Sequence, residues 1–366
     1  MVRSSGGVPP VWAALLKFLP RHNRVLDWGS WHGLAALWLR VVWDNRVVYA
    51  HSSSLCLAQA RDSAVASGLD LETAAMFPLT GQWETVILAA PESNDAFALL
   101  AGQAAACVVP GGQVLVVDKQ YRSEVLEQQF ANVSPQDSGE GWTIIRCQQA
   151  RAEGSPLPWR NIQVLVRGIQ VELDTLPGNF SPQGLDRGTW TMLEEAQIPL
   201  GGRVLDLACG YGIVGIVAAK LGAGEVVYVD DDLVALAACR HNLEKLALGG
   251  ELVHSHDLRM VAGRFDCILT NPPYHTDYGV AKRFIDFTAE RLTCGGWLYV
   301  VVKKPDWYVN KIRALFGGCR VVERDGYSVI STQRRPIKST GINRPKTTRK
   351  HARRQQATRG RERKNG

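Results

Sequence analysis

The sequence predicts two tandem α/β domains, each with a doubly wound and mostly parallel sheet, followed by a basic tail without a core of its own. Three observations lead to this prediction. Segments of the first copy recur in the second, apolar strands alternate with helices, and the composition changes abruptly near residue 334. The length of 366 residues agrees with two domains, because single domains commonly have about 100–200 residues.

Three pairs of segments carry the repeat. They are RVLDWGSWHGLAALWL (24–39) with RVLDLACGYGIVGIVA (203–218), WETVILAAP (83–91) with FDCILTNPP (265–273), and PGGQVLVVDK (110–119) with CGGWLYVVVK (294–303). The offset between partners changes only from 179 to 184 residues. A chance match of one strand–turn–helix pattern is common, whereas three matches in register indicate two copies of one fold.

The second copy shows the element order most clearly. Strands are expected at 203–207, 225–230, 251–255, 265–270 and 297–303, and helices at 213–221, 233–246, 280–292 and 307–316. Strands that alternate with helices predict a parallel sheet. A closing pair of strands at 319–324 and 327–332 predicts an antiparallel edge.

The loop-forming residues between the two copies indicate where the domain boundaries are expected. The segment RAEGSPLPW (151–159) has the glycine and prolines of a loop, and two apolar strands, NIQVLVRG and IQVELDT, follow it. We therefore expect a first domain at 1–150, a linker and hairpin at 151–175, a second domain at 176–333 and a tail at 334–366.

Composition excludes several classes of protein. Hydrophobic residues make up 46% and charged residues 21% of the chain, which excludes wholesale disorder. No run approaches the ~18 apolar residues of a membrane span, and the apolar run 11–19 is short and contains Lys17, so neither a membrane segment nor a signal peptide is expected. The eight cysteines form no C-x-x-C pair. They predict buried thiols in a reducing cytoplasm, with no disulfide or metal site.

The charge of the chain is concentrated in the tail. Residues 334–366 contain 13 lysines and arginines and one acid, Glu362, which gives +12, whereas the other residues contain 29 bases and 34 acids, which gives −5. With almost no apolar residues, the tail cannot form a core. Two interpretations remain open: a solvated end, or a flexible anchor for a polyanion such as RNA.

A glycine-rich turn in the second copy indicates a ligand site. Asp206-Leu-Ala-Cys-Gly210-Tyr-Gly212 lies between a strand and a helix, where glycines let a ligand approach the backbone. Asp230 ends the next strand, where an acid can accept ribose hydroxyls. A dinucleotide-binding enzyme shares these features. Asp257 follows the third strand and is either a partner of an adenine amino group or a helix N-cap.

The segment Asn271-Pro272-Pro273-Tyr274 follows the fourth strand and is the most specific signal. Two prolines after a strand end fix an extended turn. This turn directs the Asn271 amide and the neighbouring carbonyls into the cleft beside the glycine-rich turn, and Tyr274 offers a stacking face. A purely structural turn is the alternative.

These motifs resemble the Rossmann-like class I S-adenosylmethionine-dependent methyltransferases that act on exocyclic amino or amide nitrogens. The degenerate copy before an intact one, with PGNFSPQGLD upstream, resembles the ribosomal RNA small subunit methyltransferase C family and its large-subunit relative. The resemblance implies S-adenosylmethionine as cofactor and a guanine N2 amino group as substrate. Its implied cofactor residues are Asp206, Ala208, Gly210, Gly212, Asp230, Asp257 and Asn271; its implied catalytic residues are Asn271, Pro272 and Tyr274; its implied substrate residues are Tyr274, Phe180 and Ser181, with Asp186 near the methionine end.

Two positions depart from the family pattern. Alanine stands at position 208, where glycine is usual, and the stretch VKKPDWY (302–308) keeps clearly only Tyr308 of the family's motif. The first departure is small enough for a loop to absorb.

The first copy lacks the residues that the site requires. In the repeat alignment Trp31 stands for Gly210 and His51 for Asp230, and Ala89-Ala90-Pro91 replaces Asn271-Pro272-Pro273. Three chemical requirements therefore fail together. We predict that the first copy is an inert scaffold or an RNA-docking domain.

The leading functional hypothesis is a cytoplasmic S-adenosylmethionine-dependent methyltransferase of a guanine N2 amino group in rRNA, with 16S rRNA favoured. Its partner would be ribosomal RNA or a ribosomal subunit particle, with the basic tail on RNA phosphates and no membrane. The same motif also suits DNA adenine-N6 or protein glutamine-N5 methylation. A non-catalytic RNA-binding ribosome assembly factor is the alternative from another class.

Overall fold

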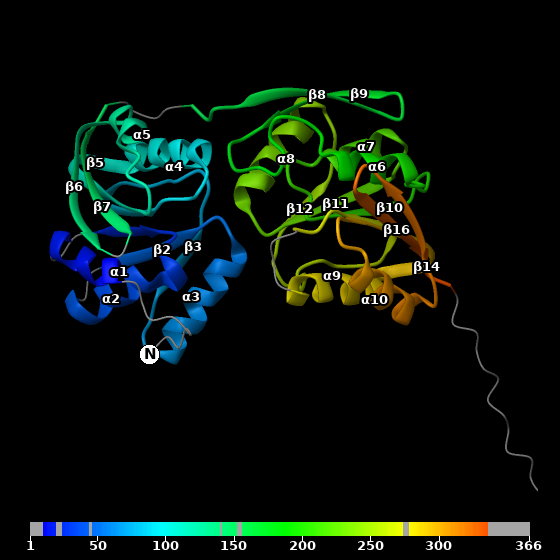
Figure 1. Cartoon of the computed structure of the whole chain (residues 1–366), viewed down its shortest axis with the longest axis horizontal. Coiled ribbons are helices and arrows are strands. Elements are labelled where there is room, and N and C mark those ends of the chain that lie inside the picture. Colours follow the sequence, from blue (N-terminus) through cyan, green and yellow to red (C-terminus); the bar gives the residue numbers. More distant parts are fainter. Residues whose placement is uncertain are drawn as a thin grey trace, which may run out of the picture. The chain divides into compact units, whose positions relative to one another are not determined.

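Two halves of the chain have the same topology. The computed structural model describes residues 10–19, 24–43, 46–139, 141–151, 156–273 and 278–335. We call residues 10–151 the first half and residues 156–335 the second half. Each half contains a seven-stranded sheet with helices on both faces (Figure 1), which confirms the predicted fold class. Among the described residues no helix is long and apolar enough to cross a membrane.

The first sheet has the order β3-β2-β1-β4-β5-β7-β6. Its strands are β1 (Val25–Trp28), β2 (Val47–His51), β3 (Glu72–Ala75), β4 (Trp83–Ala89), β5 (Val108–Asp118), β6 (Phe130–Gly139) and β7 (Trp142–Ala150). Its helices are α1 (Pro10–Leu15), α2 (Leu34–Trp43), α3 (Ser54–Ala66), α4 (Asn94–Cys107) and α5 (Ser123–Glu127), with short 3₁₀ turns η1 (Leu16–Phe18) and η2 (Trp31–Gly33). β7 runs antiparallel to both of its neighbours, β5 and β6, and the other strand pairs of this sheet are parallel.

The second sheet repeats this order as β12-β11-β10-β13-β14-β16-β15. Its strands are β10 (Arg203–Leu207), β11 (Glu225–Asp230), β12 (Glu251–His254), β13 (Phe265–Thr270), β14 (Leu292–Val302), β15 (Arg320–Arg324) and β16 (Tyr327–Gln333). Its helices are α6 (Arg187–Glu195), α7 (Ile213–Lys220), α8 (Leu233–Lys245), α9 (Tyr278–Arg291) and α10 (Asp306–Phe316). The expected antiparallel edge is formed by β16 against β14 and β15.

The strands at the centre of each sheet are buried on both faces, so their sequences are continuous apolar runs rather than alternating ones. In the second half α6, α7 and α8 cover one face and α9 and α10 the other (Figure 1). In the first half α1, α2 and α3 cover one face and α4 and α5 the other. This arrangement leaves the carboxyl ends of the parallel strands as the place where ligands bind in such folds.

A separate hairpin precedes the second sheet. Its strands are β8 (Arg160–Val166) and β9 (Ile169–Thr175). The strands alternate buried and exposed residues, and the buried ones, Ile162, Val164, Val166, Val171 and Leu173, pack into the core of the second half. The hairpin is therefore part of the packing of that half.

Three details differ from the sequence-based expectations. The predicted strand at 297–303 is the end of a longer strand, because β14 begins at Leu292 and keeps its pairing to β13 across a register shift. The expectation of buried cysteines is wrong for Cys294, which is exposed, and holds only partly for Cys56 and Cys319. Arg334, the first residue of the expected tail, still forms backbone hydrogen bonds with Gly295 and Gly296. Residues 336–366 lie outside the described part of the chain.

Candidate functional site

A cavity of about 400 Å³ lies at the carboxyl ends of β10, β11 and β13. Seven of the predicted site residues line it. They are Phe180, Asp206, Ala208, Gly210, Asp230, Asn271 and Pro272, joined by Asp186 from the segment before α6. Residues from five separate segments of the second half thus meet at one place.

Asp206 fixes the turn between β10 and α7. Its side chain is buried, and its Oδ2 accepts a hydrogen bond from the backbone N of Gly215 at 2.8 Å. Burial raises the pKa of Asp206 to about 7, against the opposing effect of this hydrogen bond. The carboxyl group ties the strand to the first turn of the helix and so shapes the loop between them.

The loop itself has left-handed backbone at three positions, Ala208 (φ +63°), Gly210 (φ +54°) and Gly212 (φ +91°). A Cβ at Gly212 would lie 2.6 Å from the Sγ of Cys239, so this glycine is required for packing. A Cβ at Gly210 would meet no atom within 4 Å, because Gly210 borders the cavity. Ala208 keeps the left-handed conformation without a glycine, so the loop absorbs this departure at the cost of backbone strain.

Asp230 connects this loop to the end of β11. Its Oδ2 accepts the backbone N–H of Gly210 at 2.9 Å, and its Oδ1 accepts that of Asp232 at 3.0 Å. Burial raises the pKa of Asp230 to about 6, and the nearby Asp232 and Asp231 add to the increase. The carboxylate therefore lies beside the cavity with its two oxygens already oriented.

Asn271 is oriented by a network that the sequence did not predict. Its Nδ2 donates to the Oδ2 of Asp186 at 3.1 Å and to the Oγ1 of Thr189 at 2.8 Å. The hydroxyl of Tyr327, from β16, donates to the other oxygen of Asp186 at 2.9 Å. The amide nitrogen of Asn271 is a donor and the Oδ2 of Asp186 is its acceptor, so the nitrogen faces Asp186. The amide oxygen is consequently turned away from Asp186.

Asn179 is a further lining residue that the sequence analysis missed. Its side chain is 6% exposed and its Oδ1 accepts the backbone N–H of Leu176 at 2.8 Å. Its Nδ2 has no hydrogen-bond partner among the described residues. A buried amide donor without a partner is costly, so a ligand acceptor in this cavity would satisfy it. The PGNFS segment contained this signal, whereas Tyr327 lies too far along the chain to be linked to Asn271 by spacing.

Three predicted residues, Ser181, Gly212 and Asp257, are placed differently. Ser181 has φ +49° and donates from its hydroxyl to the carbonyl oxygen of Gly184, as a turn residue does. Gly212 supports the loop from behind, outside the cavity lining. Asp257 does not line the cavity, and its carboxylate accepts the backbone N–H of Arg259, which caps a turn. Tyr274 lies outside the described residues.

A smaller, mainly apolar cavity of about 110 Å³ adjoins the first one and shares Ala208, Asp230 and Pro273 with it. Its other lining residues from the second half include Val229, Ser255, His256 and Phe284. A flat apolar group could lie here with a polar group in the larger cavity. One residue of the first half, Leu55, also lines this cavity.

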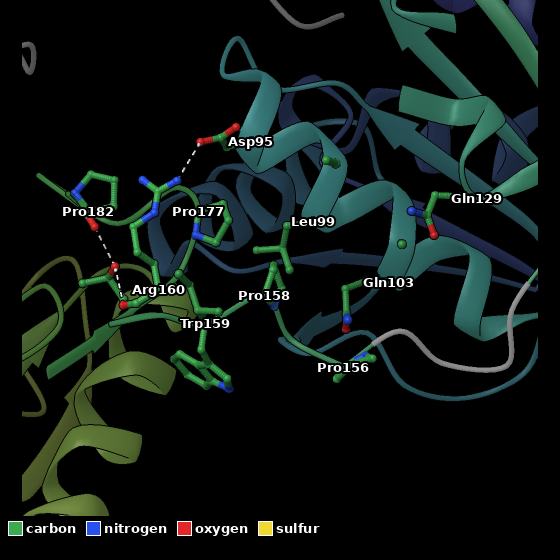
Figure 2. Close-up of a pocket in the computed structure, with 14 residues that line it drawn as sticks. Asp95, Leu99, Gln103, Gln129, Pro156, Pro158, Trp159, Arg160, Pro177 and Pro182 are labelled. Atoms are coloured by element: carbon green, nitrogen blue, oxygen red, sulfur yellow. Dashed lines mark hydrogen bonds and ion pairs between the residues drawn. The ribbon is translucent and has the colours of Figure 1, made fainter. Parts of the chain in front are cut away.

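A third cavity, of about 470 Å³, shares no lining residue with these two and is lined from α4, the hairpin and the segments beside it (Figure 2). Figure 2 shows the guanidinium of Arg160 directed at Asp95, with a nitrogen–oxygen distance of 3.9 Å. Most of the lining consists of prolines and uncharged side chains. It contains no arrangement of acids, bases or nucleophiles that resembles the first cavity.

The fold and the site together define a class I methyltransferase. The sheet contains one antiparallel strand, a glycine-rich turn follows its central strand, an acid ends the next strand, and Asn-Pro-Pro follows the fourth. The family model of the methyltransferase small domain matches residues 170–331.

Curated relatives and a solved structure narrow the class to one family. Ribosomal RNA small subunit methyltransferase C of Pseudomonas aeruginosa (strain UCBPP-PA14) is 30% identical over 269 residues, which cover 70% of this chain and 80% of that protein. The protein of this name from Pseudoalteromonas atlantica is 26% identical over 347 residues, 88% of this chain and 99% of that protein. The T. thermophilus 16S rRNA N2 methyltransferase RsmC, in complex with AdoMet and guanosine, aligns with a TM-score of 0.75 and 26% identity over 90% of this chain and 93% of that chain. The chain therefore belongs to the ribosomal RNA small subunit methyltransferase C family, which confirms the predicted resemblance.

Proposed function

We infer that the protein is an S-adenosylmethionine-dependent methyltransferase that modifies the exocyclic N2 amino group of a guanine in 16S rRNA. The observation that carries this inference is the orientation of Asn271, whose nitrogen is held by Asp186 and Thr189 at the edge of the cavity beside the glycine-rich turn. Family membership and the likeness to a solved enzyme complexed with AdoMet and guanosine support the same substrate class.

The residues of the cavity fit this cofactor. The carboxylate of Asp230 can accept hydroxyl donors of a ribose, and the open face at Gly210 leaves room for a ligand against the backbone. The Nδ2 of Asn179 offers a buried donor for an acceptor such as an amino-acid carboxylate. The adjoining apolar cavity suits a flat adenine ring. Each part of the ligand therefore has a group of matching chemistry.

The chemistry of the site is that of positioning rather than strong base catalysis. Bound S-adenosylmethionine supplies an electrophilic methyl group. A guanine amino nitrogen is a weak nucleophile because its lone pair is delocalised into the ring. The Oδ1 of Asn271 and the carbonyl oxygen of Pro272 can accept the two N–H bonds, which favours a pyramidal nitrogen with its lone pair available. Preoriented acceptors of this kind account for large rate effects in enzymes.

Asp186 acts through Asn271 in this scheme. By accepting hydrogen bonds from Asn271, Tyr327 and the backbone of Thr189, it keeps the amide from rotating. Phe180, 53% exposed at the cavity, and Tyr274 are the proposed surfaces on which the unpaired guanine stacks. Asp257 remains proposed as a partner of the adenine amino group.

The remaining proposals concern the chain outside the site. We propose that the basic tail contacts RNA phosphates, that the enzyme works in the cytoplasm on rRNA or a subunit particle, and that domain boundaries lie near residues 150, 175 and 333. Affinity for RNA decreases as the salt concentration rises. Removing residues 336–366 should make this dependence less steep: the magnitude of the slope of log affinity against log salt should decrease by roughly 0.7–0.9 for each phosphate that the tail neutralises in the full chain. An unchanged slope would identify the tail as a solvated end.

The function is tested by mapping methylated nucleotides with mass spectrometry. Small-subunit particles and free 16S rRNA from a deletion strain are incubated with purified protein and labelled cofactor. A new N2-methylguanine at a single position is the expected product. Label in adenine, in protein glutamine, or in nothing at all under conditions of saturating cofactor would contradict the proposal and point to one of the alternative substrates or to a non-catalytic role.

A further inference from the structure

The loop that follows β11 is held by the first half of the chain. Asp231, the neighbour of Asp230, accepts hydrogen bonds from the hydroxyl of Ser53 at 2.6 Å and from the backbone N of Leu55 at 2.9 Å. The hydroxyl of Ser54 provides a further donor. These donors lie at the start of α3, where free N–H groups favour a negative charge. The carboxylate beside the proposed ribose acid is thus fixed by another part of the fold.

Backbone pairing strengthens this contact. The N–H of Ser54 donates to the carbonyl oxygen of Asp231, and the N–H of Leu233 donates to that of Ser52, both at 3.0 Å. Ser53 and Asp232 form an isolated antiparallel bridge. Because Asp232 donates its N–H to Asp230, the pairing reaches the ribose acid through one residue.

A second contact with the first half lies beside another segment that lines the larger cavity. Leu99 of α4 forms an apolar cluster with Leu176 and Val234 of the second half. Gly178, which lines the cavity, lies against α4 so closely that a Cβ there would be 3.7 Å from the Cβ of Ala96. The ion pair in Figure 2 joins α4 to the same region. Two of the segments that border the cavity therefore contact the first half.

Leu55 connects these contacts to the ligand site itself. It donates its backbone N–H to Asp231, and it also lines the smaller apolar cavity beside Ala208 and Asp230. Its neighbour Ser54 is within 3.2 Å of the Nδ1 of His256, which lines that cavity as well. The start of α3 thus completes the wall of the cavity that suits an adenine ring.

We propose that the first half is a positioning domain for the cofactor: the start of α3 holds the Asp230–Leu233 loop through Asp231, and Leu55 closes the adenine side of the site. The affinity of the second half for S-adenosylmethionine then depends on its contact with the first half. This inference rests on the proposed function, since it concerns the same site. In this role the first half uses its surface. The role requires none of the site residues that the first half lacks.

Asp231→Asn tests the proposal, because an effect of charge and a loss of positioning would change cofactor affinity in opposite directions. The charge of Asp231 raises the pKa of Asp230, so its removal alone would favour ionised Asp230 and leave ribose binding equal or tighter. Loss of positioning predicts the opposite, a dissociation constant for S-adenosylhomocysteine that rises about 5- to 50-fold, within the usual range of coupling between sites. Calorimetric titration measures this constant without turnover. Asp62→Asn, an exposed acid on the same helix, is the matched control.

Two more variants separate positioning from general damage. Ser54→Asp places a carboxylate against Asp231 and should weaken binding, and adding Asp231→Asn should restore part of it. Leu55→Ala should weaken binding, whereas Val65→Ala, at an exposed position of α3, should not. Thermal melting without ligand checks that each variant is folded.

The outcomes are distinct. A wild-type protein that binds no S-adenosylhomocysteine would overturn the proposed function. Wild-type binding with folded Asp231→Asn, Ser54→Asp and Leu55→Ala variants that equal their controls would overturn the positioning proposal alone, as would tighter binding by Asp231→Asn.

Discussion

The two halves of the molecule keep the same buried aspartate but differ at the last residue of the next strand. Asp27 accepts the backbone N–H of Ala36 at 2.9 Å, as Asp206 accepts that of Gly215. These pairs are equivalent in the repeat, and both aspartates are buried. This carboxyl group is therefore part of what the fold needs at the strand–helix turn, independent of any ligand.

The difference lies at His51 and Asp230. The Nδ1 of His51 accepts the backbone N–H of Ser53 at 2.8 Å, the bond that Asp230 makes with Asp232. Burial lowers the pKa of His51 and keeps it a neutral acceptor, against the opposing effect of Asp232 and Asp231. A histidine therefore satisfies the turn, but it supplies no carboxylate for a ribose.

The ring of His51 also takes up space. A Cβ at Gly29, the equivalent of Ala208, would lie 3.6 Å from the His51 Cδ2, so the ring lies over the first turn, and it is parallel to Trp28 within 2°. In the second half the equivalent residues, Ala208 and Asp230, line both cavities. The first half therefore keeps the acceptors that its own backbone needs, Asp27 and His51, and lacks the carboxylate that the second half has at Asp230.

The largest expected effect is that of Asn271→Ala. Losing one preoriented acceptor commonly lowers the rate by a factor of about 10²–10³, while cofactor binding should change little because Asn271 acts on the guanine. Single-turnover methylation and calorimetry on the same variant measure the two quantities. Ala89→Asn, the reverse change at the equivalent position of the first half, should alter neither. Near-normal turnover by Asn271→Ala would mean that the Asn-Pro-Pro turn has only a structural role.

Exchanging the residues that distinguish the halves should have the next largest effect. Asp230→His gives the second half the turn residue of the first, and we expect cofactor affinity to fall about 10- to 150-fold, as for the removal of one or two charge-assisted hydrogen bonds. The reverse change, His51→Asp, should not create a second site, because Trp31 remains where Gly210 stands. Equilibrium binding measures both. If Asp230→His retained its affinity, the carboxylate of Asp230 would not be part of the cofactor site.

The pH dependence of binding should report the same residue. Ribose hydroxyls donate to the ionised carboxylate, so affinity should be full above the pKa of about 6 and decrease as the pH falls through it. Below that pH the loss approaches tenfold per unit. Asp230→Asn should flatten this profile, which separates Asp230 from Asp206, whose pKa is about 7. A profile that is equally steep in the variant would assign the titration to another group.

The smallest expected effect is on protein stability, at Ala208 and its equivalent Gly29 at the start of the turn. Alanine in a left-handed conformation costs about 1 kcal/mol relative to glycine. Ala208→Gly should therefore stabilise the protein by up to about 1 kcal/mol, and Gly29→Ala, at φ +82°, should destabilise it by a similar amount. Denaturant unfolding of both variants checks the opposite signs. Changes of the same sign would contradict the strain at Ala208.

Sequence alone was sufficient for the fold and for the residues with local signals. The repeat, the glycine-rich turn and Asn271 are each specified by neighbouring residues, because strand ends and turns restrict which residues fit. The network of Asp186, Thr189 and Tyr327 was not predictable as a unit, since its members come from elements brought together only by the sheet. The hydrogen bonds between α3 and Asp231 were missed for the same reason. Asp257 followed a strand in the expected way, but its carboxylate is used by its own turn.

The number of cofactor molecules bound per chain tests the central claim most directly. The claim is that two copies of one fold provide a single S-adenosylmethionine site, in the second half. Calorimetric titration of the full chain should give a stoichiometry near one, and Asp230→Ala combined with Gly210→Trp should abolish it. Two equivalent sites in the wild-type protein, or one site that survives this double change, would contradict the account.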